Sequence, residues 1–481
     1  MVKKSIKIKV CIFVMLGITL IFSACFSGCS QKTDITSYKI NASLDEKNMT
    51  VNASMEVNYY NDSESELQEV KFKLYPNAYK EGQPSPITAA DIQTVFPNGI
   101  SYGRIDISNV RVNGQEVTTK GANGQIMSVP AKVKPYKNVT IKMNFCLTLP
   151  NAKHRLGFYE GNINLGNWYP IVCVYEDGEW DENTYYPLGD PFYSKIANYT
   201  VNFSFPQGYE FASTAKASIK DGETTASLKV KKARDFAICL TKNRIYSKNA
   251  DGVLVKYFGK ENESEFLDTA IDALKTFNNL FGKYPYDSLC VVKTPFYTGG
   301  MEYPGLVYVS DNLNESLTKE VIVHEIAHQW WYAVVGNNQV SEAWMDEGLA
   351  EYSTTLFYEY NSNYGVQKSK RVADAMTSYI LYSDTHLSGG KADSCMNKNL
   401  TEFTDQLNYT YMTYVKGQLM FETLSNIIGS KTFIKGLKHY YKHNKFKVAK
   451  TDDIIASFEK VSKKELKSFF DSWLYGRVKM Y

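Results

Sequence analysis

The chain has 481 residues, more than a single hydrophobic core normally supports, so two or three domains are expected. Hydrophobic residues make up 44% of the chain and charged residues 22%, a composition that excludes an intrinsically disordered protein. The formal net charge is +3 and no basic cluster is interleaved with aromatic residues, so nothing indicates a nucleic-acid partner.

Residues 1–32 have the pattern of a secretory signal, in which lysines precede an uncharged apolar stretch, Val10 to Ala24. The stretch is followed by Phe26-Ser27-Gly28-Cys29, which resembles a bacterial lipobox, where small residues precede a lipidated cysteine. Phe26 stands where Leu is usual. We therefore predict a lipoprotein signal peptide over residues 1–29, lipidation of Cys29, and a lipid-anchored protein on the extracytoplasmic face of a bacterial cell membrane.

Two alternatives remain open for this segment. Cys25, after Ser23-Ala24, is a second and weaker candidate for lipidation. Val10–Gly28 comprises 19 uncharged residues, which is just long enough to span a bilayer as an uncleaved anchor. In each case the remainder of the chain is expected outside the cytoplasmic membrane.

Between about Ser37 and Leu240, short runs of alternating apolar and polar residues are separated by turn residues. Alternation with a period of two is typical of half-buried strands in antiparallel sheets. The clearest predicted strands are 38–44, 55–59, 70–74 and 139–145, and tight turns are predicted at Asn113-Gly114 and Asp251-Gly252. We therefore predict an N-terminal β domain over residues 30–245.

After Lys242 the apolar residues recur at helical spacing. Glu265–Phe281 predicts a helix that Gly282 ends, and a strand at 289–292 and a glycine-rich turn at Thr298–Tyr303 follow. Further helices are predicted at 318–335, 342–360, 367–383, 411–428, 432–443, 452–461 and 464–474. The fold class is therefore α+β and multidomain, with a mainly helical second domain over residues 246–481.

The predicted helix 318–335 contains the motif His324-Glu325-Ile326-Ala327-His328. Two histidines four residues apart lie on one face of a helix, so both imidazoles can reach one metal ion, with Glu325 beside it. The alternative is an ordinary core helix, because apolar residues surround the motif.

Catalytic zinc sites commonly take three protein ligands. Glu347 lies 19 residues after His328, at the start of the next predicted helix, so two packed antiparallel helices would gather His324, His328 and Glu347 around one Zn2+ ion. Any acidic helix supplies glutamates, but Trp344 and Gly348 beside Glu347 single this one out.

The segments HEIAHQWW and WMDEGLA resemble the aminopeptidase N family of zinc metallopeptidases, gluzincins that include membrane alanyl aminopeptidase and leukotriene hydrolase. The family pattern is HExxH, eighteen residues, and Glu within W-x-x-E-G, whereas thermolysin-type endopeptidases place the Glu one residue later. The resemblance implies a saddle-like antiparallel β domain followed by a thermolysin-like, mainly helical catalytic domain that holds one Zn2+ per chain.

The resemblance extends to the substrate side of the site. Gly299, Gly300, Met301 and Glu302 resemble the family's G-x-M-E-N strand, which implies that this segment binds the peptide and that Glu302 binds its free α-amino group. Tyr303 stands where the family has Asn, which leaves the strictness for the N-terminus open. The family's β domain adds a second amine-binding residue; Tyr186–Ser194 resembles a family segment, but no counterpart of that residue is evident.

Downstream, Tyr409-x4-Tyr414-Val415-Lys416-Gly417 resembles the family's Y-x4-Y-E-K-G segment, which implies that Tyr414 donates a hydrogen bond to the developing oxyanion. The resemblance also implies that Glu325 is the general base. Glu351, one helical turn after Glu347, is a candidate for orienting one of the histidines, and a solvated acidic face is the alternative.

The function predicted from these motifs is that of a zinc-dependent aminopeptidase with a peptide substrate. The C-terminal segment FFDSWLYG resembles the end of the family's catalytic domain, so a more open cleft is expected. The alternatives are an endopeptidase or specialised peptidase of the same family, or a non-catalytic peptide-binding lipoprotein. Side-chain preference, biological substrate and oligomeric state are not specified by these motifs.

Overall fold

The structure, a computed structural model, describes residues 34–220, 222–387, 393–476 and 478. From Ile35 onward these residues belong to one compact unit. The predicted signal peptide, with Cys29 and Cys25, lies outside the described residues. Within the described ranges, every helix is too short or too polar to cross a bilayer.

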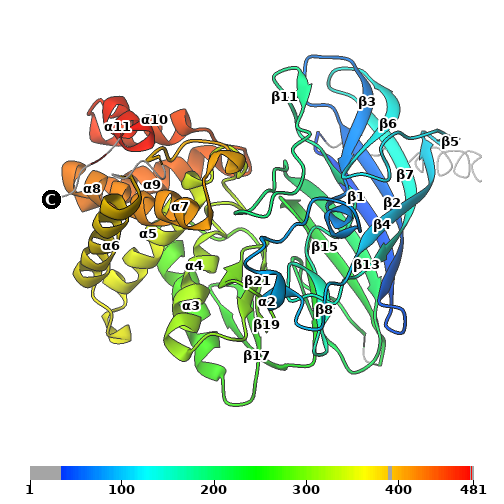
Figure 1. Cartoon of the computed structure of the whole chain (residues 1–481), viewed down its shortest axis with the longest axis horizontal. Coiled ribbons are helices and arrows are strands. Elements are labelled where there is room, and N and C mark those ends of the chain that lie inside the picture. Colours follow the sequence, from blue (N-terminus) through cyan, green and yellow to red (C-terminus); the bar gives the residue numbers. More distant parts are fainter. Residues whose placement is uncertain (1–33, 221, 388–392, 477, 479–481) are drawn as a thin grey trace, which may run out of the picture. The chain divides into compact units, whose positions relative to one another are not determined.

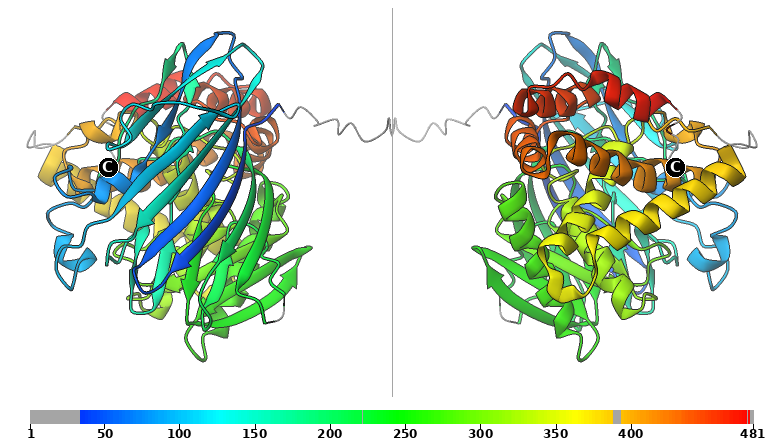
Figure 2. Two further views of the ribbon diagram at one scale, coloured as in Figure 1. Left: turned by 90° about the vertical axis from the view of Figure 1, so that its right-hand side faces the viewer. Right: turned by 90° about the vertical axis from the view of Figure 1, so that its left-hand side faces the viewer.

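The first half is built on a seven-stranded sheet whose order is β15-β13-β1-β2-β7-β4-β5 (Figures 1 and 2). Its longest pairing joins β2 and β7, antiparallel and in register over the whole of both strands. The predicted alternation is confirmed, since β1 buries every second side chain. The bounds are β1 (Ser37–Asp45), β2 (Thr50–Tyr60), β4 (Arg104–Val112), β5 (Gln115–Glu116), β7 (Asn138–Thr148), β13 (Ala197–Ser204) and β15 (Thr225–Ala233).

Two smaller sheets share the core of the seven-stranded sheet. Their orders are β10-β3-β6 and β14-β16-β9-β8, and a short hairpin, β11-β12, lies beside them in sequence. The bounds are β3 (Leu67–Lys73), β6 (Ile126–Val133), β8 (Leu156–Tyr159), β9 (Asn162–Leu165), β10 (Ile171–Val172), β11 (Tyr175–Glu176), β12 (Glu179–Trp180), β14 (Glu210–Ser213) and β16 (Ile238–Thr241). Helical structure here is limited to η1 (Tyr75–Tyr79) and α2 (Ile92–Val95) within the described part.

A five-stranded sheet, β17-β18-β19-β21-β20, connects the two halves. Every residue of β19 (Ser288–Thr294) and β21 (Leu306–Ser310) is buried. Their alternate side chains belong to two different cores: Val291 and Val307 pack with the helices, whereas Val292 and Tyr308 pack with the β domain. The other bounds are β17 (Arg244–Ala250), β18 (Val253–Gly259) and β20 (Gly300–Met301).

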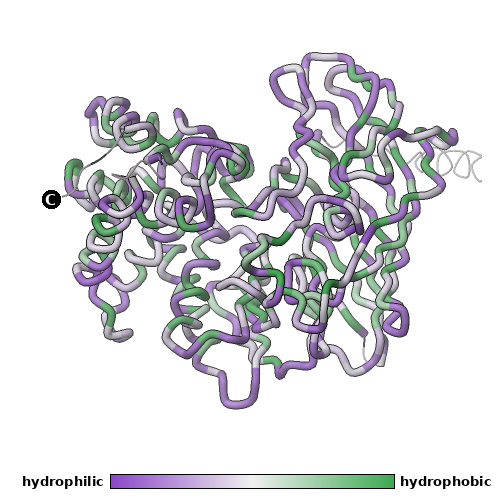
Figure 3. Tube along the Cα trace, viewed as in Figure 1, coloured by the Kyte–Doolittle hydropathy of each residue, from purple (hydrophilic) through white to green (hydrophobic). Residues whose placement is uncertain are grey.

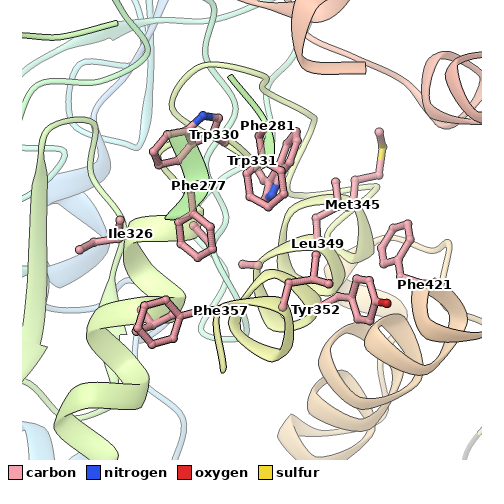
Figure 4. Packing of buried hydrophobic residues seen from close by; sticks show 14 of the residues in the cluster. Phe277, Phe281, Ile326, Trp330, Trp331, Met345, Leu349, Tyr352, Phe357 and Phe421 are labelled. Carbon is pink, nitrogen blue, oxygen red and sulfur yellow. The ribbon is translucent and has the colours of Figure 1, made fainter. Parts of the chain in front are cut away.

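The second half is mainly helical and packs around a large aromatic core (Figure 4). Together with the N-terminal sheets, this confirms the predicted α+β class. In Figure 3 the hydropathy changes repeatedly along helices and strands, as expected for elements with one buried and one exposed face. The bounds are α3 (Ser264–Leu280), α4 (Glu315–Ala327), α5 (Trp344–Tyr360), α6 (Lys368–Tyr382), α7 (Gln406–Thr410), α8 (Lys416–Ile428), α9 (Ser430–Asn444), α10 (Thr451–Ser462) and α11 (Lys467–Tyr475), with η2 (Ser362–Tyr364), η3 (Ser383–Leu387), η4 (Leu400–Glu402) and η5 (Tyr411–Val415).

The predicted extent of the motif helix, 318–335, is wrong at its C-terminal end, because α4 ends at Ala327. Past that point the chain makes tight turns, in which Trp330 N–H donates to the Ala327 carbonyl at 3.0 Å. In an α-helix the side chains of consecutive residues point about 100° apart, so neighbours do not share one face. Because the chain leaves the helix at Ala327, both Trp330 and Trp331 are buried against Phe281 (Figure 4).

The helix predicted at 411–428 is observed, with the π-helical turn η5 as its first five residues and α8 from Lys416 to Ile428. The turns predicted at Asn113-Gly114 and Asp251-Gly252 are confirmed, since all four residues have positive φ. The domain boundary between residues 245 and 246 stays a prediction, because the described chain forms one compact unit from Ile35 onward.

Candidate active site

Three ligand-type atoms meet where α4 ends and α5 begins. Nε2 of His324 and Nε2 of His328 are 3.2 Å apart, and each lies 3.3 Å from Oε2 of Glu347. A tetrahedral ion with bonds of about 2.0–2.1 Å separates its ligands by roughly 3.3 Å. The spacing of the three residues therefore fits one Zn2+ ion.

Each histidine uses its second ring nitrogen to fix its orientation. Nδ1 of His328 lies 3.1 Å from the Trp331 carbonyl, which the turn after α4 places there. Nδ1 of His324 lies 3.2 Å from Oε2 of Glu351. Glu351 is held in turn by Arg371 of α6, whose Nη2 donates to Oε1 at 3.0 Å. Such partners leave both Nε2 atoms directed at the metal position.

Glu302, His328 and Asp346 also have potential ligand atoms within 4.8 Å of one another. His328 takes part in both groups, yet its Nδ1 is occupied by the Trp331 carbonyl and its Nε2 faces His324 and Glu347. This second group is therefore not an independent metal site.

Glu325 is buried beside the two histidines, against the backbone of edge strand β20. A Cβ added at Gly300 would collide with the Glu325 carboxylate, so the glycine allows the strand to run close to it. Burial raises the pKa of Glu325 to about 8, against the opposing effect of the neighbouring imidazoles.

Glu302 follows β20 directly and is only 3% exposed. Its Oε1 accepts a hydrogen bond of 2.9 Å from Nε2 of Gln339. Burial raises the pKa of Glu302 to about 7, and the charge of Asp190 adds to that effect. No role was predicted for Asp190, which lies within the segment Tyr186–Ser194.

Asp190 is held near the segment of Glu302 by Arg155, a buried arginine of the β domain. Nη2 of Arg155 donates to Oδ1 of Asp190, and Nε of Arg155 donates to the Met301 sulfur at 3.0 Å. Met301 is the residue before Glu302, so the guanidinium holds Asp190 near the segment that carries Glu302. The β domain thus contributes a carboxylate to the site, a contact between distant segments that no local pattern signals.

Tyr414 lies on the π-helical turn η5 and stacks on the His324 ring, with centroids 5.7 Å apart and planes at 18°. Burial, together with the charge of Glu347, raises the pKa of Tyr414 well above its ordinary value, so the phenol stays protonated. Such a phenol is a hydrogen-bond donor to negative charge at the metal position.

Tyr303, the departure from the family pattern, points away from this group of residues. It is fully buried with the β-domain core, and its hydroxyl donates to Oδ1 of Asn167 at 3.0 Å. Gly166 leaves the room for the ring, since a Cβ there would collide with the Tyr303 hydroxyl. Glu302 and Tyr303 therefore face opposite sides of one extended segment.

A family model described as peptidase family M1 domain matches residues 265–473. Aminopeptidase M1-A of Oryza sativa subsp. japonica is 26% identical over 425 residues, covering 80% of this chain and 46% of that protein. Aminopeptidase N of Lactococcus lactis subsp. lactis is 25% identical over 240 residues, covering 46% of this chain and 28% of that protein. The chain spans less than half the length of these curated relatives.

Solved structures show the same fold. An M1 zinc metallopeptidase from Deinococcus radiodurans superimposes with a TM-score of 0.63 at 16% identity, over 94% of this chain and 96% of that chain. The match covers the N-terminal β domain as well as the helical domain. Family model, relatives and fold agree with the motif resemblance: residues 265–473 match a peptidase family M1 domain, and the chain is similar to the aminopeptidase N type of zinc metallopeptidases.

Proposed function

We propose that the protein is a zinc-dependent aminopeptidase that removes N-terminal residues from peptides. The observation that carries the proposal is the joint geometry of His324, His328 and Glu347, spaced for one zinc ion, with Glu302 beside them. When bound there, zinc would polarise the scissile carbonyl and lower the pKa of water. A mutant of the Deinococcus radiodurans relative is known with a Tyr-ser-ala substrate bound, which supports a short peptide as substrate.

The chain's own side chains have three roles in this proposal. Glu325 accepts the proton of the attacking water and delivers it to the leaving amine. Tyr414 donates a hydrogen bond to the oxyanion, which carries full charge only after attack and is thus stabilised selectively. Glu302, with Asp190 nearby, pairs with the substrate ammonium, so a free N-terminus is selected over a blocked one.

Metal analysis combined with Glu325→Gln tests the chemistry. We expect about one zinc per chain in both proteins, because Glu325 is not among the three ligands. Hydrolysis should fall by roughly 10²–10⁴-fold in the variant, the usual contribution of a general base. Absence of zinc, or hydrolysis that is unchanged in Glu325→Gln, would contradict the mechanism and favour a non-catalytic binding protein.

A matched pair of peptides tests whether the protein requires a free N-terminus in its substrate. One peptide has a free α-amino group and the other is acetylated there. The aminopeptidase proposal requires faster cleavage of the free peptide at its first peptide bond. Equal cleavage of both peptides would identify an endopeptidase of the same family.

We also propose that the protein is tethered to the outer face of a bacterial cell membrane through lipidated Cys29. The support is the basic and apolar segment that precedes Phe26-Ser27-Gly28-Cys29. Mass spectrometry of the mature N-terminus should find a diacyl- or triacyl-modified cysteine at position 29, and Cys29→Ala should remove the modification. Cys25→Ala is the matched control, and a chain that retains an unmodified Met1 would exclude lipidation.

A further inference from the structure

Gln339 lies in the loop between α4 and α5 and is only 1% exposed. Its Nε2 donates two hydrogen bonds, one to Oε1 of Glu302 at 2.9 Å and one to Oδ2 of Asp346 at 2.7 Å. Its Oε1 is buried and has no hydrogen-bond partner among the described residues. The Gln339 amide therefore donates a hydrogen bond to each of two carboxylates and accepts none from the described residues.

The orientation of this amide is determined by its surroundings. Turning it over would place Oε1 against two carboxylate oxygens and would leave both acids without their donor. Asp346 is itself fixed, because its Oδ1 accepts a hydrogen bond of 2.9 Å from Nδ2 of Asn337. It also directly precedes Glu347 at the start of α5. Gln339 thus connects Glu302 to a rigid part of the metal-site framework.

The contact also determines which oxygen of Glu302 remains available. Oε1 is taken by Gln339, which leaves Oε2 for another donor. Without the amide, a buried carboxylate would lie near Asp346 and Asp190 with no donor to hold it, and its position would no longer be defined. With the amide in place, Oε2 is presented to an incoming N–H donor.

We infer that Gln339 is a positioning residue that sets how strongly the site selects a free α-amino group, by holding Glu302 in place between the substrate position and Asp346. The inference rests on the proposed function, in which Glu302 binds the ammonium. Gln339 itself does not touch the substrate. Its loss should therefore weaken recognition of the amino group and leave the rest of the peptide contacts intact.

The test measures binding in the zinc-loaded Glu325→Gln protein, in which slow hydrolysis leaves time to measure peptide binding. Gln339→Leu removes both donors, and Gln339→Glu keeps the shape but turns the donor into an acceptor. The dissociation constant of a peptide with a free N-terminus should rise roughly 10–100-fold in either variant, as expected for a lost hydrogen bond to a buried charge. The dissociation constant of the acetylated peptide should not change.

Gln418→Met is the matched control, since Gln418 is also buried and hydrogen-bonded, at 3.0 Å to the Thr355 hydroxyl, but does not contact Glu302. It should leave the ratio of the two dissociation constants at its original value. Zinc content and thermal unfolding are measured for each variant, so that a misfolded protein is recognised. Gln339→Glu provides a second variant if Gln339→Leu does not fold.

A double-mutant cycle separates positioning of Glu302 from other effects. In a Glu302→Ala background, Gln339→Leu should not change the preference for the free peptide any further. The inference would be overturned if the affinity for the free and the acetylated peptide fell equally. It would also be overturned if the ratio of the two dissociation constants stayed unchanged in both Gln339 variants. A parent protein that binds both peptides equally would contradict amine recognition by Glu302 and this inference together, whereas failure of wild-type hydrolysis alone would contradict only the proposed function.

Discussion

Two successive residues at the end of β20 have opposite environments. Glu302 faces the metal-binding group, whereas Tyr303 is enclosed by the β domain and donates to Asn167. Asn167 in turn donates to Oδ2 of Asp235 at 2.7 Å. Tyr303, a departure from the family motif, therefore anchors the edge strand to the β-domain core on the side away from Glu302.

Tyr303→Phe is expected to cost about 1–2 kcal/mol of stability, because Asn167 loses its hydrogen bond in a buried position. The preference for free over acetylated peptide should not change. Urea unfolding and the matched peptide pair measure the two quantities. Tyr308→Phe is the control, because it loses a hydrogen bond of 2.9 Å to the Ile238 carbonyl. If the preference for free over acetylated peptide changed in Tyr303→Phe and not in the control, Tyr303 would belong to the site.

Asp235 should give the stability a measurable pH dependence. Burial raises its pKa to about 6, although the Phe236 amide and the Tyr169 hydroxyl donate to its carboxylate. Its pKa in the unfolded chain is about 3.9, so the folded chain binds this proton more tightly. The stabilisation linked to that proton is complete below about pH 4 and is lost as the pH rises through about 6.

The measurement compares wild type with Asp235→Asn. The free energy of unfolding of wild type, relative to the variant, is expected to fall by about 2 kcal/mol between pH 4 and pH 7 and then to stay level. Because both proteins share all other titrating groups, the difference isolates Asp235. A difference that is constant over this range would show that Asp235 ionises normally in the folded chain.

At the level of elements, the spacing of α5 and α8 determines where Tyr414 lies. A Cβ added at Gly417 would be 2.8 Å from the Cα of Gly348, so the two helix backbones are in direct contact at this point. Gly348 directly follows Glu347, and Gly417 lies one helical turn after Tyr414. The contact thus connects a predicted metal ligand with the predicted oxyanion donor.

Gly417→Ala is expected to push α8 away from α5, at a cost of about 1–3 kcal/mol. It should also lower kcat, because the Tyr414 ring moves from its stacked position on His324. Gly436→Ala on α9 is the control, since its Cβ would press on Phe458, far along the chain from Tyr414. The control should lose stability and keep its normal kcat. A normal kcat in Gly417→Ala as well would show that the spacing of the two helices does not determine the position of Tyr414.

At the level of the whole molecule, Arg234 joins three distant segments. Its guanidinium is buried and donates to the carbonyls of Ser194, Tyr332 and Lys447, each at 2.8 Å. These residues belong to the β domain, to the turn after α4 and to the segment after α9. Gly336 packs directly on the guanidinium, where a Cβ would collide with it.

Arg234→Met is expected to cost more than about 3 kcal/mol, because three buried carbonyls lose their donors at once. Arg234→Lys should recover little, since one ammonium cannot reproduce the planar fork of donors. The control is Arg104→Met, which breaks only an exposed pair with Asp106 and should stay within about 0.5 kcal/mol of wild type. Urea unfolding of the three variants tests the expectation, which a small loss in Arg234→Met would contradict.

Local patterns in the sequence were sufficient for the elements and for part of the site. Alternation of polarity located β1, β2, β3 and β7, because half-buried strands encode their two faces residue by residue. Helical spacing located α3, α4 and α5, and the last two bring His324, His328 and Glu347 together as a group that could hold one metal ion. The motif helix was predicted too long because local propensity does not register the burial of Trp330 and Trp331.

The remaining features were decided by tertiary structure. The sequence by itself determined the fold class. It also identified His324, His328 and Glu347 as candidate metal ligands and Tyr414 as a candidate site residue, since each of these assignments depends on short spacings along the chain. Arg155 and Met301 are 146 residues apart, and Arg234 and Lys447 are 213 residues apart. Contacts at such separations depend on how the sheets and helices pack, so Asp190, the two-way donor Gln339 and the inward direction of Tyr303 became visible only in the folded chain.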